Sequence, residues 1–366
     1  MTVTASHSLR MNTRATSPLR SRPAVRNFLE PQTLTPADLS MVLLVTMEPA
    51  DRPMPTVTVA EIPAVMREAS RLGLRSVKLF AESAERDDTG TISLEPDALM
   101  SRAIHACKDA EPSIAVMTET CLCSHTADGV CYLTHRSRRP DVAATVHVTA
   151  LQAVAHAEAG ADIVGPASML LGTTGGARRA LDETGHEGVS VMPHVIFWSS
   201  LYDGFRLTMG ATPKAGVNRE FQINPGRADQ FVDTALRMEA DGADMILPEP
   251  AQFTADVLAT LRTQTRAPLF PFSVSGEYKA FTHVDSETGR RDVRLLIELF
   301  TMLKPAGASA SVTYAALDIA RQLSWCRLRH RPRGRPVLRQ GSNARPGRQD
   351  RRPGSHRAFP ARRTGR

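Results

Sequence analysis

The chain has 366 residues, enough for one large or two ordinary domains, and its 42% hydrophobic and 23% charged residues are proportions of a water-soluble globular protein. No apolar run approaches the roughly 20 residues that cross a bilayer. The polar, Arg- and Ser-rich residues 1–26 lack the apolar core of a secretion signal. From these features we expect a cytoplasmic protein with no membrane partner.

The positive charge is concentrated at the C-terminal end of the chain. From Ser324 onward there are fourteen arginines and one acid, Asp350, a net charge of +13, so the preceding residues carry −6 of the total of +7. An acidic body argues against a basic nucleic-acid-binding fold. Residues 324–366 are rich in Pro, Gly and Arg and almost without apolar residues, so we expect a disordered basic tail with no specific nucleic-acid partner. A reading-frame artefact of a GC-rich gene is the alternative.

Between residues 1–35, which we expect to form an N-terminal arm, and the tail, residues 36–323 alternate apolar runs with amphipathic stretches. Apolar runs of this length are typical of strands buried on both faces, and apolar residues at a 3.6-residue period predict helices. The predicted strands are residues 41–47, 76–81, 113–119, 161–167, 189–195, 243–248, 268–275 and 308–315. The predicted helices are residues 59–72, 96–109, 145–159, 176–183, 226–240, 255–264 and 293–304.

Eight strands alternating with helices predict an α/β fold of the (β/α)8 barrel type rather than a doubly wound sheet. No Gly-x-Gly-x-x-Gly or phosphate-binding loop follows the first strand, which argues against a nucleotide-binding sheet. Barrel enzymes place their functional side chains at the carboxyl ends of the strands. Those ends carry Cys121 and Cys123, Ser168, His194 and Ile196, Glu249, Ser275, and Tyr314.

Three of the five cysteines, Cys121, Cys123 and Cys131, lie within eleven residues after the third predicted strand. Thiolates are soft ligands that suit Zn²⁺, and three protein ligands leave a fourth position open, as in catalytic zinc sites. From the spacing alone, reduced and partly buried thiols are an equal alternative, and a disulfide is less favoured. The hydroxyls, carboxylate and imidazole expected at the same barrel mouth favour zinc.

Several motifs, in order from about Met11 to Leu323, carry a resemblance to a known family. They are Ser76-Val-Lys-Leu-Phe80, Glu85-Arg-Asp-Asp-Thr-Gly90, the cysteine stretch 118–131, Ala157-Glu-Ala-Gly-Ala-Asp-Ile-Val164, Tyr202-Asp-Gly-Phe-Arg206, Gly242-Ala-Asp-Met245, Ser273-Val-Ser-Gly-Glu-Tyr278 and Thr313-Tyr-Ala315. The chain resembles porphobilinogen synthase (δ-aminolevulinic acid dehydratase), which condenses two 5-aminolevulinates into a pyrrole in tetrapyrrole and heme biosynthesis. The resemblance implies a TIM barrel whose N-terminal arm embraces a neighbour in a homo-oligomer, often an octamer.

The resemblance also implies which residues meet metal and substrate. The family's zinc cysteines fall on Cys121, Cys123 and Cys131, where zinc would polarise a carbonyl or amine of the substrate. Glu277 resembles the glutamate of an allosteric magnesium site, with a surface acid at a helix start as the alternative. The positions that would hold the substrates' carboxylates are Ser275 and Tyr314 for one, and Arg206 and Gln222 for the other, with Arg219 or Asn218 beside them.

The two lysines that form Schiff bases in the family fall on Ile196 and Glu249, and neither side chain can form an imine. The next nearest lysines in the sequence, Lys214 and Lys279, are not on predicted strand ends. Glu249 is instead a candidate general acid or base, or an ion-pair partner of Arg206 or Arg219. His194 is a candidate assistant or a satisfied core histidine.

Three functions stay open at this level. The first is a working porphobilinogen synthase, against which the missing lysines argue. The second is a zinc-dependent lyase or condensing enzyme for another small keto or amino acid. The third is a non-catalytic paralogue that binds a ligand or joins an authentic synthase.

Overall fold

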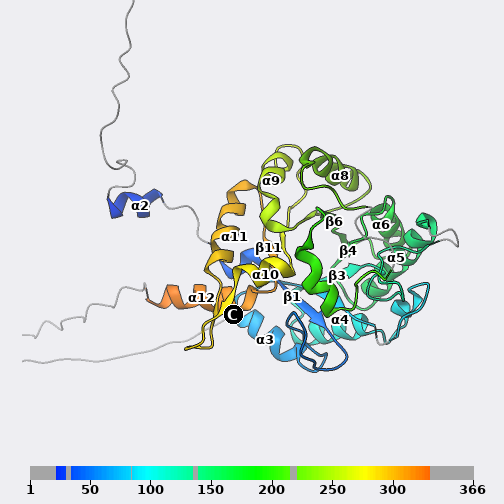
Figure 1. Cartoon of the computed structure of the whole chain (residues 1–366), viewed down its shortest axis with the longest axis horizontal. Coiled ribbons are helices and arrows are strands. Elements are labelled where there is room, and N and C mark those ends of the chain that lie inside the picture. Colours follow the sequence, from blue (N-terminus) through cyan, green and yellow to red (C-terminus); the bar gives the residue numbers. More distant parts are fainter. Residues whose placement is uncertain (1–21, 30–33, 84, 135–138, 215–220, 330–366) are drawn as a thin grey trace, which may run out of the picture.

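The structure, a computed structural model, describes residues 22–29, 34–83, 85–134, 139–214 and 221–329 (Figure 1). Over this part of the chain, parallel strands lie at the centre and helices pack around them. None of the helices described is both long and apolar enough to cross a membrane.

Eight strand positions follow one another along the chain, as predicted. They form from apolar, β-branched runs because both faces are covered by protein, and β1 is buried at all seven of its residues. The strands are β1 (Leu39–Val45), β2 (Ser76–Ala81), β3 (Ala115–Thr120), β4 (Ile163–Pro166), the split fifth strand β5 (Ser190–Val191) and β6 (His194–Ile196), β7 (Leu247–Glu249), β8 (Phe272–Ser273) and β11 (Ser311–Thr313).

The strands close into a curled sheet. Seven are hydrogen-bonded in the order β5-β4-β3-β2-β1-β11-β8, and β6 pairs with β7. The fifth strand is interrupted at Met192–Pro193, where proline has no N–H for a ladder bond. The gap between β7 and β8 is bridged by two hydrogen bonds of the residues that precede these strands. Ile246 N donates to the carbonyl of Pro268, and Phe270 N donates to the carbonyl of Ile246. This arrangement confirms the predicted barrel-type α/β fold.

All seven predicted helices are present, with bounds shifted by a few residues. α3 ends at Leu72 as predicted, because Gly73 adopts a left-handed conformation (φ 89°) that favours glycine. The helices are α2 (Pro23–Leu29), α3 (Ile62–Leu72), α4 (Leu99–Ala110), α5 (Val142–Glu158), α6 (Thr173–Glu183), α7 (Asp203–Thr208), α8 (Ala228–Ala240), α9 (Ala255–Leu261), α10 (Ser275–Phe281), α11 (Arg294–Ala306) and α12 (Ala316–Arg329).

Several elements were not predicted. α7 and α10 have only six and seven residues and were not predicted from the apolar pattern, yet both position residues of the site. The others are the hairpin β9 (His283–Val284) and β10 (Arg291–Asp292), the 3-10 helices η1 (Pro36–Asp38), η2 (Thr91–Leu94), η3 (Ser200–Tyr202) and η5 (Ala251–Phe253), and the helices α2 and α12.

The prediction that the disordered tail begins at Ser324 is wrong for its first six residues, since α12 continues to Arg329. The helix is anchored earlier, where Ile319 and Ala320 are fully buried. Arg321 also makes two hydrogen bonds of 3.0 and 2.9 Å to the carboxylate of Glu68 on α3. The rest of the predicted tail, and most of the predicted arm, lie outside the described residues.

Candidate active site

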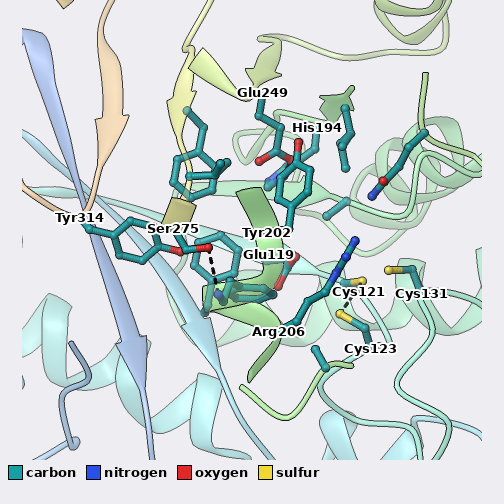
Figure 2. A pocket seen from close by; sticks show the side chains of 18 residues that line it. Glu119, Cys121, Cys123, Cys131, His194, Tyr202, Arg206, Glu249, Ser275 and Tyr314 are labelled. Atoms are coloured by element: carbon teal, nitrogen blue, oxygen red, sulfur yellow. Dashed lines mark hydrogen bonds and ion pairs between the residues drawn. The ribbon is translucent and has the colours of Figure 1, made fainter. Parts of the chain in front are cut away.

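A cavity opens at the carboxyl ends of the barrel strands, where the predicted site residues were expected to meet (Figure 2). Its walls come from strands β2, β3, β6, β7 and β8 and from the segments that follow β3, β4, β6, β8 and β11. Ten of the predicted site residues line it: Cys121, Cys123, Cys131, His194, Ile196, Arg206, Gln222, Glu249, Ser275 and Tyr314. Arg219 lies outside the described residues.

The three predicted metal ligands come together at one side of this cavity. Their sulfur atoms all lie within 4.8 Å of one another, and the Sγ atoms of Cys121 and Cys123 are 3.4 Å apart. Tetrahedral Zn–S bonds of about 2.3 Å would place the sulfurs about 3.8 Å apart, so only small movements are needed. The hydrogen bond from Cys121, followed by that from Cys131, holds the pKa of Cys123 well below its usual range, whereas the pKa values of Cys121 and Cys131 lie well above it. The thiol set therefore fits a soft divalent metal.

The loop between the second and third cysteines depends on a glycine. Gly129 has φ 68°, and a Cβ there would lie 2.5 Å from the carbonyl oxygen of Thr212. Only glycine combines this left-handed conformation with so close an approach. The turn brings Cys131 back beside Cys121 and Cys123, which immediately follow β3.

The two hydroxyls expected to bind a carboxylate lie together on the opposite side of the cavity (Figure 2). The hydroxyl of Ser275, at the start of α10, accepts from Phe205 N (3.0 Å) and donates to the carbonyl of Leu201 (2.8 Å). Burial, with the charge of Glu249, holds the pKa of Tyr314 well above its usual range, so its phenol stays a hydrogen-bond donor. Ser275 thus also ties α10 to the segment carrying α7.

Arg206 and Gln222 supply the other expected carboxylate contacts. The guanidinium of Arg206 lies 5.6 Å from the ring of Tyr202 and makes a long, 3.4 Å contact with Asp203. In Figure 2 it lies on the cysteine side of the cavity. The side-chain oxygen of Gln222 is buried without a hydrogen-bond partner among the described residues. A guanidinium with one weak partner suits a ligand carboxylate.

Glu249 and His194 form a buried pair. The Nδ1 atom of His194 lies 3.0 Å from Oε1 of Glu249, and both side chains are almost fully buried. Burial raises the pKa of Glu249 to about 8, although the charge of Lys78 opposes the rise. Burial, then the charge of Lys78, lowers the pKa of His194 well below its usual range, so its imidazole is neutral.

The contact between His194 and Glu249 bears on the alternative roles predicted for these two residues. Glu249 binds His194, whereas Arg206 binds Asp203, so the alternative of an ion pair between Glu249 and Arg206 is wrong. The alternative of a pair with Arg219 involves a residue outside the described part of the chain. His194 is not a satisfied core histidine either, because its Nε2 atom is buried without a hydrogen-bond partner in the described structure. An unpartnered buried ring nitrogen in a cavity wall is available to a ligand.

The remaining predicted residues are Ile196, Ser168 and Glu277. Ile196 forms an apolar part of the cavity wall. Ser168 does not line the cavity, and its hydroxyl accepts from Leu170 N (3.2 Å). The alternative of a surface acid at Glu277 is wrong, because this carboxylate is fully buried and accepts from the N–H groups of Gln252 and Val274 (both 2.7 Å). Among the described residues, Glu277 belongs to no cluster of three potential metal ligands.

Two charged residues of the site were missed. Lys78, on β2, is fully buried and donates to the carbonyl of Thr118 (2.9 Å), and it interacts electrostatically with Glu249. Glu119, on β3, lines the cavity. The available signal was a charged residue inside each of two strands predicted to be buried on both faces, a costly placement unless it serves a site.

Comparison with known proteins identifies the family to which this chain is similar. The model of the family "Delta-aminolevulinic acid dehydratase" matches residues 13–322. The delta-aminolevulinic acid dehydratase of Escherichia coli is 33% identical over 310 residues, which cover 82% of this chain and 95% of that protein. The protein of the same name from Synechococcus elongatus is 31% identical, covering 84% of this chain and 97% of its own.

A solved structure agrees. The delta-aminolevulinic acid dehydratase (porphobilinogen synthase) of Toxoplasma gondii, in complex with the reaction product porphobilinogen, superposes with a TM-score of 0.77 at 26% identity. The match covers 85% of this chain and 92% of that one. Sequence and structure together show that this chain belongs to the delta-aminolevulinic acid dehydratase, or porphobilinogen synthase, family.

Proposed function

We propose that this chain is a porphobilinogen-synthase-like, zinc-dependent lyase that takes 5-aminolevulinate, or another small keto or amino acid, into the cavity at the barrel mouth. The observation that carries the proposal is the meeting of three thiols, a guanidinium and a buried acid–base pair in one cavity. The relatives named for this activity cover nearly the whole barrel, which supports the same substrate class.

Cys121, Cys123 and Cys131 would hold the zinc ion. When bound, the ion supplies a Lewis acid that polarises a carbonyl or amine of the ligand. Arg206 would bind the ligand's carboxylate through paired N–H donors, and the neutral phenol of Tyr314 would donate a further hydrogen bond. These contacts fix the ligand between the cysteine side and the hydroxyl side of the cavity.

The His194–Glu249 pair would move a proton to or from the ligand. When Glu249 is ionised, His194 donates from Nδ1 to it, and Nε2 is an acceptor. When Glu249 is protonated, it donates to Nδ1, and the ring carries its hydrogen on Nε2 as a donor. The free Nε2 atom thus takes or gives a proton while Glu249 balances the charge. This is general acid–base chemistry with a group that titrates near neutral pH.

Ile196 and Glu249 leave no amine at the positions of the family's two lysines. A Schiff base with the substrate therefore cannot form at those positions, and we expect turnover of 5-aminolevulinate well below that of the relatives.

We also propose a cytoplasmic homo-oligomer, an octamer by family. Light scattering of the protein alone and mixed with an authentic synthase would test this. The magnesium role of Glu277 stays a prediction.

The test uses the full-length protein loaded with zinc and given 5-aminolevulinate. We expect saturable binding by calorimetry, with porphobilinogen formed slowly if at all. The variant R206Q should weaken binding roughly 10- to 100-fold, because a hydrogen bond to a charged group contributes about 1.5–3 kcal/mol. R227Q is the matched control, since Arg227 is exposed and paired with Asp229. Wild-type protein that binds no 5-aminolevulinate, or equal binding by R206Q, would contradict this proposal.

A further inference from the structure

Lys78 is a charged side chain enclosed inside the barrel, and the proposed function leaves it unused. It lies in the middle of β2 and is fully buried. Its amine is 5.5 Å from the ring centre of Phe80, which lines the cavity from the same face of the strand. Enclosing an ammonium in a protein interior costs several kcal/mol unless other charges compensate it.

The position of the amine is held by backbone from two other strands. Nζ donates to the carbonyl of Thr118 on β3, at 2.9 Å. On β4, a Cβ at Gly165 would lie 2.6 Å from Nζ and 2.9 Å from the same carbonyl. Gly165 therefore leaves the space that the amine occupies. Lys78 thus reaches from β2 across β3 to a fixed point beside the cavity.

Two acids of the cavity wall compensate the charge of this amine. Lys78 interacts electrostatically with Glu119 and with Glu249, both of which line the cavity. Burial, opposed by these two charges, lowers the pKa of Lys78 to about 8. The barrel interior therefore contains a lysine and two acids in place of an apolar layer.

The other groups that face Glu249 do not favour its ionised form. His194 is neutral, Glu277 is a carboxyl that raises the pKa of Glu249, and the phenols of Tyr202 and Tyr314 remain protonated. The charge of Glu249 in turn helps to raise the pKa of Glu119, after burial and the charge of Cys123. Within the described structure, Lys78 is the cation that lowers the pKa of Glu249.

We infer that Lys78 is a positioning residue for Glu249: its enclosed charge allows the buried carboxyl to release and regain a proton beside His194. A proton taken from a ligand at Nε2 of His194 is matched by the Nδ1 proton moving to Oε1 of Glu249, and the reverse step returns both. Without the lysine, Glu249 would stay protonated and the pair could not accept a proton. The inference rests on the acid–base role proposed for Glu249, but its test needs neither ligand nor metal.

The experiment is an infrared titration of the full chain as purified, following the protonated-carboxyl band that is absent from E249Q. We expect the band to disappear with a midpoint near pH 8 in the wild type. In K78M the midpoint should rise by about one unit or more, a tenfold or greater loss of acidity. K78R, which keeps the charge, should titrate like the wild type. The matched control is K108M, because Lys108 pairs with Asp162 (2.9 Å), away from the cavity.

K78Q is a second neutral variant in case K78M does not fold, since its amide can still donate to the carbonyl of Thr118. A purely structural lysine would lower the stability of both neutral variants and leave the Glu249 midpoint unchanged, which would overturn the inference. A borohydride-trapped adduct of 5-aminolevulinate on Lys78 would also overturn it, because the amine would then be a nucleophile and not a fixed charge. Failure of ligand or zinc binding leaves the infrared titration unaffected.

Discussion

At the scale of single residues, the site combines groups that a ligand can use directly with groups already bound to protein. Nε2 of His194 and the side-chain oxygen of Gln222 have no partner among the described residues. The hydroxyl of Ser275, by contrast, is already bonded to the backbone on both sides. A ligand is therefore expected to bind His194 and Gln222 without breaking any bond, and to compete for Ser275.

The charge state of Glu249 has a consequence for stability. Burial raises its pKa in the folded protein from 4.5 to about 8. Between these values the folded state binds more protons than the unfolded state, so this group's contribution to stability falls as pH rises. For E249Q, which lacks this group, we expect the stability relative to wild type to increase from pH 5 to 8 by roughly 3–4 kcal/mol.

Urea unfolding of both proteins at each pH measures this difference. Groups that do not interact with Glu249 titrate alike in the two proteins and cancel in the comparison, whereas Lys78 and Glu119 lose the charge of Glu249 in the variant. Parallel curves for wild type and E249Q would show that Glu249 keeps an ordinary pKa. Such a result would also remove the basis for its acid–base role.

At the scale of elements, α10 is held against η3 by a contact that only glycine allows. A Cβ on Gly276 would lie 2.6 Å from Cα of Leu201 and 2.8 Å from its carbonyl oxygen. G276A should therefore push α10 away, displace Ser275, and lower stability by about 1–3 kcal/mol. Thermal unfolding measures the loss.

The matched control for this element is G188A, because a Cβ at Gly188 meets nothing within 4 Å. Its unfolding temperature should match the wild type. Equal stability of G276A and G188A would mean that the close packing of α10 against η3 does not hold in solution.

The elements also show which strands and helices can be predicted from the pattern of apolar residues and which cannot. β2 is predicted to the residue because Ser76–Ala81 is a short run bounded by polar positions. α7 and α10 are short and fixed by tertiary contacts, such as the bonds of Ser275, which leave no local pattern. α12 continues into an Arg-rich segment because its first turns are packed, an effect that composition does not report.

At the scale of the whole molecule, the topology of the barrel brings together side chains that are far apart in the sequence. The rule that strand ends meet at one mouth was enough to place Cys121, Glu249 and Tyr314 in one cavity, whereas Arg206 was expected there only from the family resemblance. It could not say which of these side chains pair, because Glu249 and His194 meet only when β6 and β7 lie side by side. Nor could it show that the amine of Lys78, on β2, lies against the backbone of β3 and β4.

The claim on which the whole account depends is that the three cysteines hold zinc beside the carboxylate-binding side chains. The most direct measurement is metal analysis with X-ray absorption at the zinc edge, on zinc-loaded wild type, C123S and C107A. We predict one zinc per wild-type chain with three sulfur ligands at about 2.3 Å. C123S should lose most of the metal, and C107A should keep it, because Cys107 is buried in α4. Wild type without zinc, or C123S with a full complement, would contradict the account.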